Sequence, residues 1–185
     1  MKKACVILAE GFEEVEALTP VDYLRRAGVE VTTLGIGGSS IRGAHDIVVA
    51  ADSPIETAPF GAGAWDLVVV PGGGNGSQNI AASAEARNLI IEQVASGGFL
   101  GAICAAPAVV LHGACGLLAR RRWTGYPGTE TSVTGAEFVA ERVVVDGKLI
   151  TARAAGCSGE FSRALVAALV GEGPARELEE KVLLE

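Results

Sequence analysis

The chain has 185 residues, a length suited to one domain with a full hydrophobic core rather than two. Hydrophobic residues make up 49% and charged residues 20%, which excludes an intrinsically disordered chain. The net charge of −7 argues against nucleic acid or an anionic membrane as a partner, and no segment is apolar over the length of a membrane span. We therefore expect a single cytoplasmic domain over residues 1–185.

Strand and helix patterns alternate in the first half of the chain. Apolar residues at every third or fourth position predict a helix over 13–27, which Pro20 bends and Gly28 ends. Apolar runs predict strands at 3–9, 29–34 and 66–70, with a short edge strand or hairpin arm at 47–50.

The same alternation continues in the second half. We expect a strand at 99–103 and helices at 84–96, about 106–112, 158–170 and 174–183. Asp146-Gly147 is a strong hairpin signal between strands at 143–145 and 149–152. Repeated β–α units predict an α/β, doubly wound fold, in which helices sandwich a mostly parallel sheet.

Cys104 follows the expected strand at 99–103 and begins a turn into the next helix. Reactive groups of an open α/β sheet lie at the carboxyl ends of its strands. Small residues on both sides of Cys104 allow a sharp turn with a strained, exposed apex, and the amides that start the following helix favour the thiolate. The alternative is a buried, inert cysteine, the usual state of a free thiol.

Two further loops are expected at the same edge. The glycines at 72–74 match neither the dinucleotide fingerprint nor a P-loop, and their amides, with that of Ala105, suit an oxyanion hole beside Cys104. Glu16 lies one turn into the first helix. It is either a solvated surface carboxyl or a buried one whose raised pKa lets it donate a hydrogen bond to the sulfur.

The four cysteines, at 5, 104, 115 and 157, form no CxxC pair and have no histidine at metal-ligand spacing. We expect free thiols, no disulfide and no metal site, with Cys5 in the core. The basic run Arg120-Arg121-Arg122 is interpreted as a solvated loop rather than a binding patch.

Several segments together resemble the DJ-1/PfpI (ThiJ) superfamily. They are AEGFEEVE at 9–16, PVD at 20–22, RRAG at 25–28, VPGG at 70–73 and AICA at 102–105, and the similarity runs through the whole length. The helix expected at 174–183 resembles the additional C-terminal helix of the DJ-1-like branch.

This resemblance implies a flavodoxin-like fold and a homodimer with its pocket near the subunit boundary. It implies that Cys104 is the reactive, oxidation-prone cysteine, that protonated Glu16 is its partner, and that the amides of Gly73 and Ala105 form the oxyanion hole. Arg26, with its neighbour Arg25, matches paired arginines near the dimer contact of the family.

The chain departs from the family pattern at three further positions. Ala105 replaces the histidine that follows the cysteine in the PfpI peptidase-like branch, which argues against a Cys–His protease. Tyr126 stands where animal DJ-1 proteins carry another histidine. His45 falls where relatives carry an arginine on a strand that reaches toward the pocket, and it either touches the site or lies on the surface.

A second thiol is expected near the pocket. Cys157 follows Gly156 and replaces a threonine of the family in a loop that lines the pocket. Cys157 either substitutes conservatively for that threonine or forms a disulfide with an oxidised Cys104. The remaining histidine, His112, is interpreted as structural or solvent-facing.

Two functional hypotheses follow from the residues and the resemblance. In the first, Cys104 attacks a small dicarbonyl such as methylglyoxal, and Glu16 moves the proton that leads to lactate, without cofactor or metal. The same chemistry on a glycated protein is the deglycase activity attributed to the family. In the second, the protein is a redox sensor or chaperone whose Cys104 is oxidised under stress.

Overall fold

Seven strands form one sheet in the order β10-β11-β7-β6-β1-β2-β5 in the computed structural model, which describes residues 1–61 and 63–184. Neighbouring strands are parallel except at the β10–β11 hairpin. The strands of this sheet are β1 Lys3–Leu8, β2 Glu30–Gly35, β5 Ser53–Pro54, β6 Leu67–Val70, β7 Phe99–Ile103, β10 Val143–Asp146 and β11 Leu149–Ala152. This is the expected flavodoxin-like, mostly parallel arrangement.

Two small ribbons lie outside the central sheet. An antiparallel pair joins β3, Ser40–Arg42, to β4, Val48–Ala50, so the segment expected at 47–50 is a hairpin arm. A short parallel pair joins β8, Arg122–Trp123, to β9, Glu137–Phe138.

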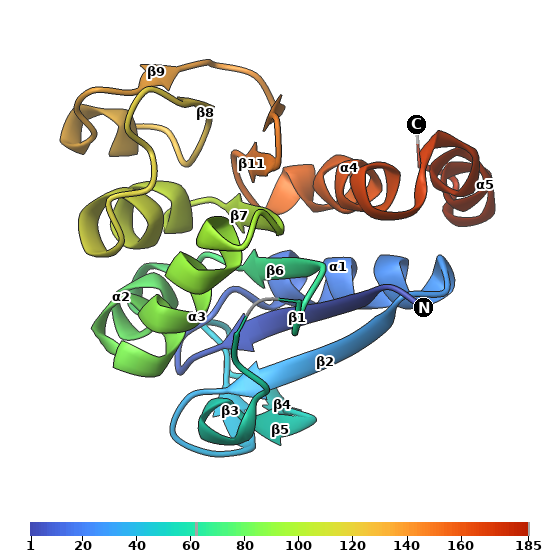
Figure 1. Ribbon diagram of the computed structural model, residues 1–185, viewed down its shortest axis with the longest axis horizontal. Helices are drawn as coiled ribbons and strands as arrows, with labels where there is room; N and C mark the ends of the chain where they lie inside the picture. Colours follow the sequence, from blue (N-terminus) through green and yellow to red (C-terminus); the bar gives the residue numbers. More distant parts are fainter. Residues whose placement is uncertain (62, 185) are drawn as a thin grey trace.

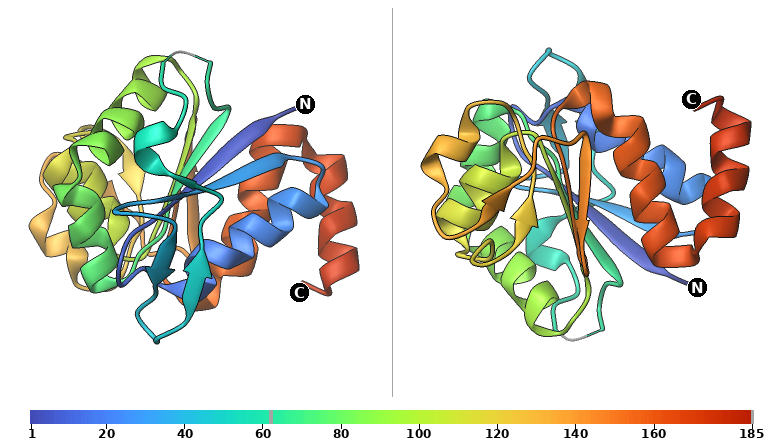
Figure 2. Two further views of the ribbon diagram at one scale, coloured as in Figure 1. Left: turned by 90° about the horizontal axis from the view of Figure 1, so that it is seen from below. Right: turned by 90° about the horizontal axis from the view of Figure 1, so that it is seen from above.

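Helices cover both faces of the sheet (Figure 2). On one face lie α1 Glu14–Arg26, α4 Ser158–Val170 and α5 Glu172–Val182, and on the other lie α2 Gly74–Ala82, α3 Ala84–Ala95 and the π-type helix η2 Pro107–Ala114. Short 3-10 turns are η1 Ile55–Thr57, η3 Thr129–Ser132 and η4 Ala155–Cys157. Within the described chain, no helix has the length and apolar character needed to cross a bilayer.

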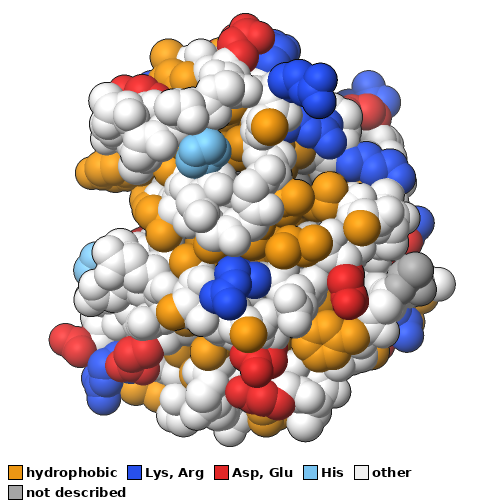
Figure 3. Space-filling view, turned by 60° about the vertical axis from the view of Figure 1, so that its left-hand side comes forward, with side chains coloured by type: hydrophobic (Ala, Val, Ile, Leu, Met, Phe, Trp, Pro, Cys, Tyr) orange, Lys and Arg blue, Asp and Glu red, His pale blue; other side chains and the backbone are white. Residues whose placement is uncertain are grey.

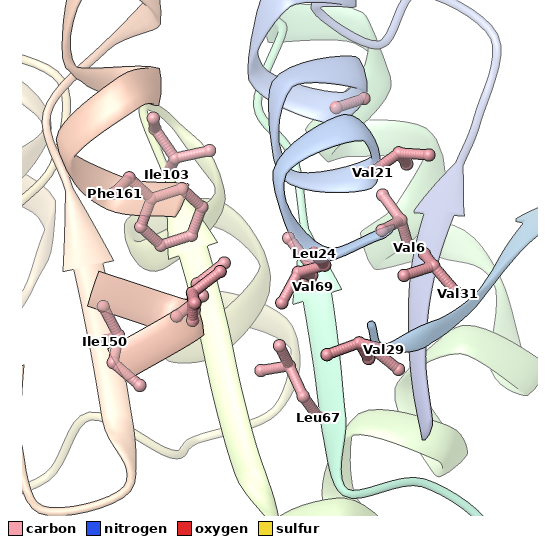
Figure 4. Close-up of a cluster of buried hydrophobic side chains, with 14 of the residues drawn as sticks. Val6, Val21, Leu24, Val29, Val31, Leu67, Val69, Ile103, Ile150 and Phe161 are labelled. Atoms are coloured by element: carbon pink, nitrogen blue, oxygen red, sulfur yellow. The ribbon is translucent and has the colours of Figure 1, made fainter. Parts of the chain in front are cut away.

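The alternation of side chains along each strand divides the core into two layers. In β1, Val6 and Leu8 belong to the layer under α1 and α4, whereas Cys5 and Ile7 belong to the layer under α2 and α3. Phe161 of α4 points toward the sheet in the first layer, near Ile103 (Figure 4). Both faces of the sheet are therefore buried, which is why its strands read as continuous apolar runs.

The carboxyl ends of the parallel strands meet at one edge of the sheet. The arrowheads of β1, β6 and β7 point to the left in Figure 1, and Figure 3 turns this side toward the viewer. Hydrophobic side chains form a band across the middle of that surface, between its upper and lower parts. The loops that follow β1, β6 and β7 all arrive at this edge, as the strand order predicts.

Two helices differ from the expectation. Helix α2 begins at Gly74, in a segment expected to be loop, because Ile80 is buried in the core and compensates for a glycine- and asparagine-rich sequence with low helix propensity. The helix expected at about 106–112 is of the π type and extends from Pro107 to Ala114. The helix expected at 158–170 and the β10–β11 hairpin are confirmed.

Phe161→Ala tests the packing beneath the site. A Cβ added to Gly101 would lie 3.1 Å from the Phe161 ring, so the ring fills the space that this strand glycine leaves open. The substitution should lower the free energy of unfolding by about 3–5 kcal/mol, measured by urea denaturation. Ile91→Ala, on a side chain that is 41% exposed, should change it by less than about 0.5 kcal/mol. Equal losses in the two variants would contradict this view of the core.

Candidate active site

Cys104 occupies a strained turn directly after β7. Its φ of +64° lies in the left-handed region that residues with a side chain rarely adopt. The turn is fixed on both sides, because the Cys104 amide donates to the Ala152 carbonyl (3.0 Å) and its carbonyl accepts from the Tyr126 amide (2.8 Å). The half-buried thiol therefore projects from a rigid position at the carboxyl edge of the sheet.

Gly72 lets three segments of the chain approach each other closely. A Cβ at this position would lie 2.5 Å from Cys104 Cβ and even closer to the Glu16 carboxylate. Its amide donates to Glu16 Oε2 at 2.9 Å. Any other residue here would push the carboxyl and the thiol apart.

Glu16 is held in the first turn of α1 with only 1% of its surface exposed. Its own amide donates to the carboxylate of Glu13, which caps the helix (2.7 Å). Its carboxyl group hydrogen-bonds the Cys104 side chain and the amides of Gly72 and Ala155. Of the two readings that the sequence left open, the structure selects the buried carboxyl.

The surroundings raise the pKa of Glu16 to about 7. Burial is the largest cause, since it penalises the charged form, and the negative charge of Glu13 adds to it. The hydrogen bonds from Cys104, Gly72 and Ala155 act in the opposite direction and are outweighed. The carboxyl is thus able to hold a proton near neutral pH.

The pKa of the Cys104 thiol is also raised, to about 12. Burial is the largest cause, followed by the charge of ionised Glu16 and the hydrogen bond to it. The amides of Gly73 and Ala105 bond the sulfur and lower the pKa, but by less. The amide at the helix start favours the thiolate, as expected, but burial beside a carboxylate outweighs it and the net shift of the pKa is upward.

The Gly73 and Ala105 amides nevertheless converge on the sulfur from two loops. Gly73 adopts a φ of +88° and is the residue before α2, while Ala105 follows Cys104 directly. Main-chain donors held in this way stabilise negative charge on an atom beside the nucleophile. Two main-chain donors therefore face the same position beside the thiol.

Arg142 and Ala155 were not singled out from the sequence. The Arg142 guanidinium donates to the carbonyl of Gly156 and to Glu160 (2.6 Å), and so ties down the loop whose Ala155 amide reaches Glu16. Because every residue except proline has a main-chain amide, the contact of Ala155 could not be predicted from its residue type. The ion pair connects residues 18 positions apart, beyond helical spacing, so it has no local pattern either.

The other expected pocket residues lie less close to Cys104 and Glu16. Tyr126 bonds Cys104 through its main chain, and its side chain is exposed. Cys157 is buried in the cluster that Cys104 borders, while Gly156 is exposed in the neighbouring turn. All four cysteines are free thiols, and Cys5 is in the core as predicted.

His45 and Arg26 lie outside the immediate surroundings of the thiol. His45 donates its amide to Glu14 and places Nδ1 2.7 Å from the same carboxylate, rather than contacting Cys104 or Glu16. Arg26 pairs with Asp22 (2.5 Å) at the far end of α1, about 15 Å along the helix from Glu16. Arg26 therefore does not line the site of its own chain.

One group of residues has the donor set of a metal site. Glu13, Glu14 and His45 bring possible ligand atoms within 4.8 Å of one another. Both carboxylates already have partners, since Glu13 caps α1 and Glu14 accepts twice from His45. The thiol and Glu16 are not part of this group.

Known proteins resemble this chain in sequence and in fold. The chain is 34% identical over 188 residues to the Parkinson disease protein 7 homolog of Danio rerio, covering 100% of this chain and 98% of that protein. It is 30% identical over 175 residues to the glutathione-independent glyoxalase DJR-1.2 of Caenorhabditis elegans, covering 94% of this chain and 90% of that one. A crystal structure of the DJ-1 superfamily protein STM1931 from Salmonella typhimurium superposes with a TM-score of 0.94 at 36% identity, over the full length of both chains.

A family model extends the agreement beyond individual relatives. Residues 2–168 match the model of the DJ-1/PfpI family, and the match includes Glu16, Gly73 and Cys104. The chain belongs to the DJ-1/PfpI family.

Proposed function

We propose that this protein is a cofactor-independent enzyme that converts small dicarbonyls such as methylglyoxal into hydroxy acids. The observation that carries the proposal is a thiol on a strained turn that shares a hydrogen bond with a buried carboxyl and faces two main-chain amides. A sensor thiol needs no oxyanion hole, whereas attack on a carbonyl does. The glyoxalase name of the Caenorhabditis elegans relative supports the same reaction class.

The thiol and carboxyl act as one proton-sharing dyad. With pKa values of about 7 for Glu16 and about 12 for Cys104, the pair keeps a single proton between these values. The higher pKa of the thiol places that proton mainly on the sulfur, and its transfer to Glu16 gives a minor form with a thiolate. In the form with a thiolate, protonated Glu16 donates to the sulfur, and Gly73 and Ala105 stabilise its charge.

The reaction follows from this form. The thiolate adds to the aldehyde carbon of methylglyoxal, and Glu16 protonates the resulting oxyanion while the two amides bind that oxygen. Glu16, now a carboxylate, takes the hydrogen of this carbon as a proton and returns it to the neighbouring carbon. The hydroxyl proton of the adduct passes to the oxygen of that neighbouring carbon, which yields a thioester of lactate. Water then releases lactate and restores the thiol, so the net change is addition of one water with no external oxidant.

The same groups would also serve a redox sensor. Protonated Glu16 and the amides of Gly73 and Ala105 are donors for the oxygens of a sulfinic acid on Cys104. Disulfide formation with Cys157, which is buried in the adjoining cluster, stays a prediction.

We further propose that two copies associate through α1 and the β3–β4 hairpin. Val15, Ile47 and Val48 are each about half exposed, and Val15, Leu18 and Ile47 line one shallow groove. Large aliphatic side chains grouped in this way are typical of an interface. Such a dimer would bring its partner to the helix that carries Glu16.

Turnover of methylglyoxal without glutathione tests the proposed reaction. Wild type should release lactate, Cys104→Ala should be inactive, and Glu16→Gln should lose at least about a hundredfold, since it cannot move the proton. Glu177→Gln, which removes an exposed carboxylate on α5, is the control and should keep full activity. A wild type without turnover, whose Cys104 still oxidises selectively under mild peroxide, would favour the sensor.

The pH dependence of Cys104 alkylation tests the dyad. As pH rises through about 7, the pair loses its first proton and the thiolate form becomes available, so the iodoacetamide rate should rise there and then level off. Glu16→Gln should lose this step, and its rate should keep rising toward the pKa of an isolated buried thiol. Identical profiles for the two proteins, after subtraction of the Cys104→Ala background, would show that no proton is shared.

Val15→Glu tests the proposed interface. A charge in an apolar contact should convert the dimer into a monomer, measured by analytical ultracentrifugation. Val145→Glu, at a side chain of equal exposure on β10, should remain dimeric (51% exposed for Val15, 52% for Val145). A monomeric wild type would remove the proposal.

A further inference from the structure

A cavity of about 220 Å³ lies at the opposite edge of the sheet from Cys104. Leu100 and Leu149 form part of its wall, near the amino ends of β7 and β11, where they are register partners. Val94 from the last turn of α3 and Leu117 from the loop after η2 line it as well. Nothing in the proposed reaction uses this cavity.

The wall of the cavity is apolar and well packed. Leu100 is 2% exposed and Leu149 6%, so both belong to the core layer under α3 and η2. A strongly hydrated ion would lose its water against these side chains without replacement. The cavity therefore suits the hydrocarbon part of a ligand.

The charged side chains that line this cavity in the described structure are both cations. Lys148 donates to the carbonyl of Gly97 and lies over the Phe99 ring, 5.6 Å from its centroid. Arg121 is 3.6 Å from Asp146 in a loose, partly exposed pair. An ammonium has three donors and a guanidinium five, so both retain donors for an anion.

A strained residue directly precedes Arg121. Arg120 has a φ of +60°, its amide donates to Gly135 (2.6 Å), and the Arg121 amide closes a turn onto Leu118 (3.0 Å). A left-handed conformation is unfavourable for a residue with a side chain. Arg122 instead lies 3.8 Å from Glu137, so the basic run is not a uniform solvated loop: one member faces the cavity.

We propose that this cavity binds a small monocarboxylate with an apolar body. The carboxylate lies between Arg121 and Lys148, and the body rests on Leu100 and Leu149. The cavity is below the roughly 300–1,000 Å³ of drug-sized sites, which excludes nucleotides and larger cofactors. The net charge of −7 further disfavours polyanions. Lactate and glycolate have no such body and are not its ligands.

Benzoate is the probe, followed by methyl NMR of protein labelled at leucine and valine. Benzoate should cause saturable shifts of the Leu100, Leu117 and Leu149 methyls, both in wild type and in Cys104→Ala. Neutral benzamide, which has the same shape, should bind at least about tenfold more weakly, a difference of about 1.4 kcal/mol. Shifts confined to the surroundings of Cys104, or equal binding of benzamide, would overturn the proposal.

Substitution of the cations separates the site from nonspecific binding. Arg121→Gln combined with Lys148→Gln should weaken benzoate by at least about tenfold, whereas Arg122→Gln should leave it unchanged. The wild-type methyl pattern in the absence of benzoate shows that each variant is folded. Full affinity in the folded double variant would overturn the proposal.

Discussion

The close contact between a buried carboxyl and a thiol is the constraint on which the rest of the site depends. Glu16 and Cys104 come from elements at different points of the chain, and they meet because Gly72 has no side chain to separate them. Helix α1 must start beside the β6 loop, and β7 must end in a strained turn. The doubly wound sheet satisfies both requirements by bringing the carboxyl ends of β1, β6 and β7 to one edge.

Burial and hydrogen bonding work against each other in this contact. Burial raises the pKa of both partners, that of Glu16 to about 7 and that of Cys104 to about 12, so near neutral pH the carboxyl is partly protonated and the thiol keeps its proton. The surrounding amides favour the anion but do not overcome burial. Between these two pKa values the pair therefore carries one proton and one negative charge.

Much of this architecture could be predicted from the sequence, because strands buried on both faces and helix boundaries have local signatures. The hairpin at Asp146-Gly147 and helix α4 are examples, and so is the proximity of the Cys104 turn to Glu16. Helix α2 could not be predicted, since burial rather than propensity stabilises it. The contact of the Ala155 amide and the Arg142 ion pair could not be predicted either, because they depend on tertiary packing.

The site is assembled from segments that lie far apart in the sequence. The Cys104 turn is anchored on Ala152, and the Glu16 carboxyl on Gly72 and Ala155, so the last of these contacts waits for the closing strand and the turn beyond it. Contacts of such long sequence separation carry a high loop-closure entropy cost. Until these segments are joined, the Cys104 turn and the Glu16 carboxyl lack part of their anchoring. The surroundings of this one sulfur are therefore complete only when the chain is in place as far as Ala155.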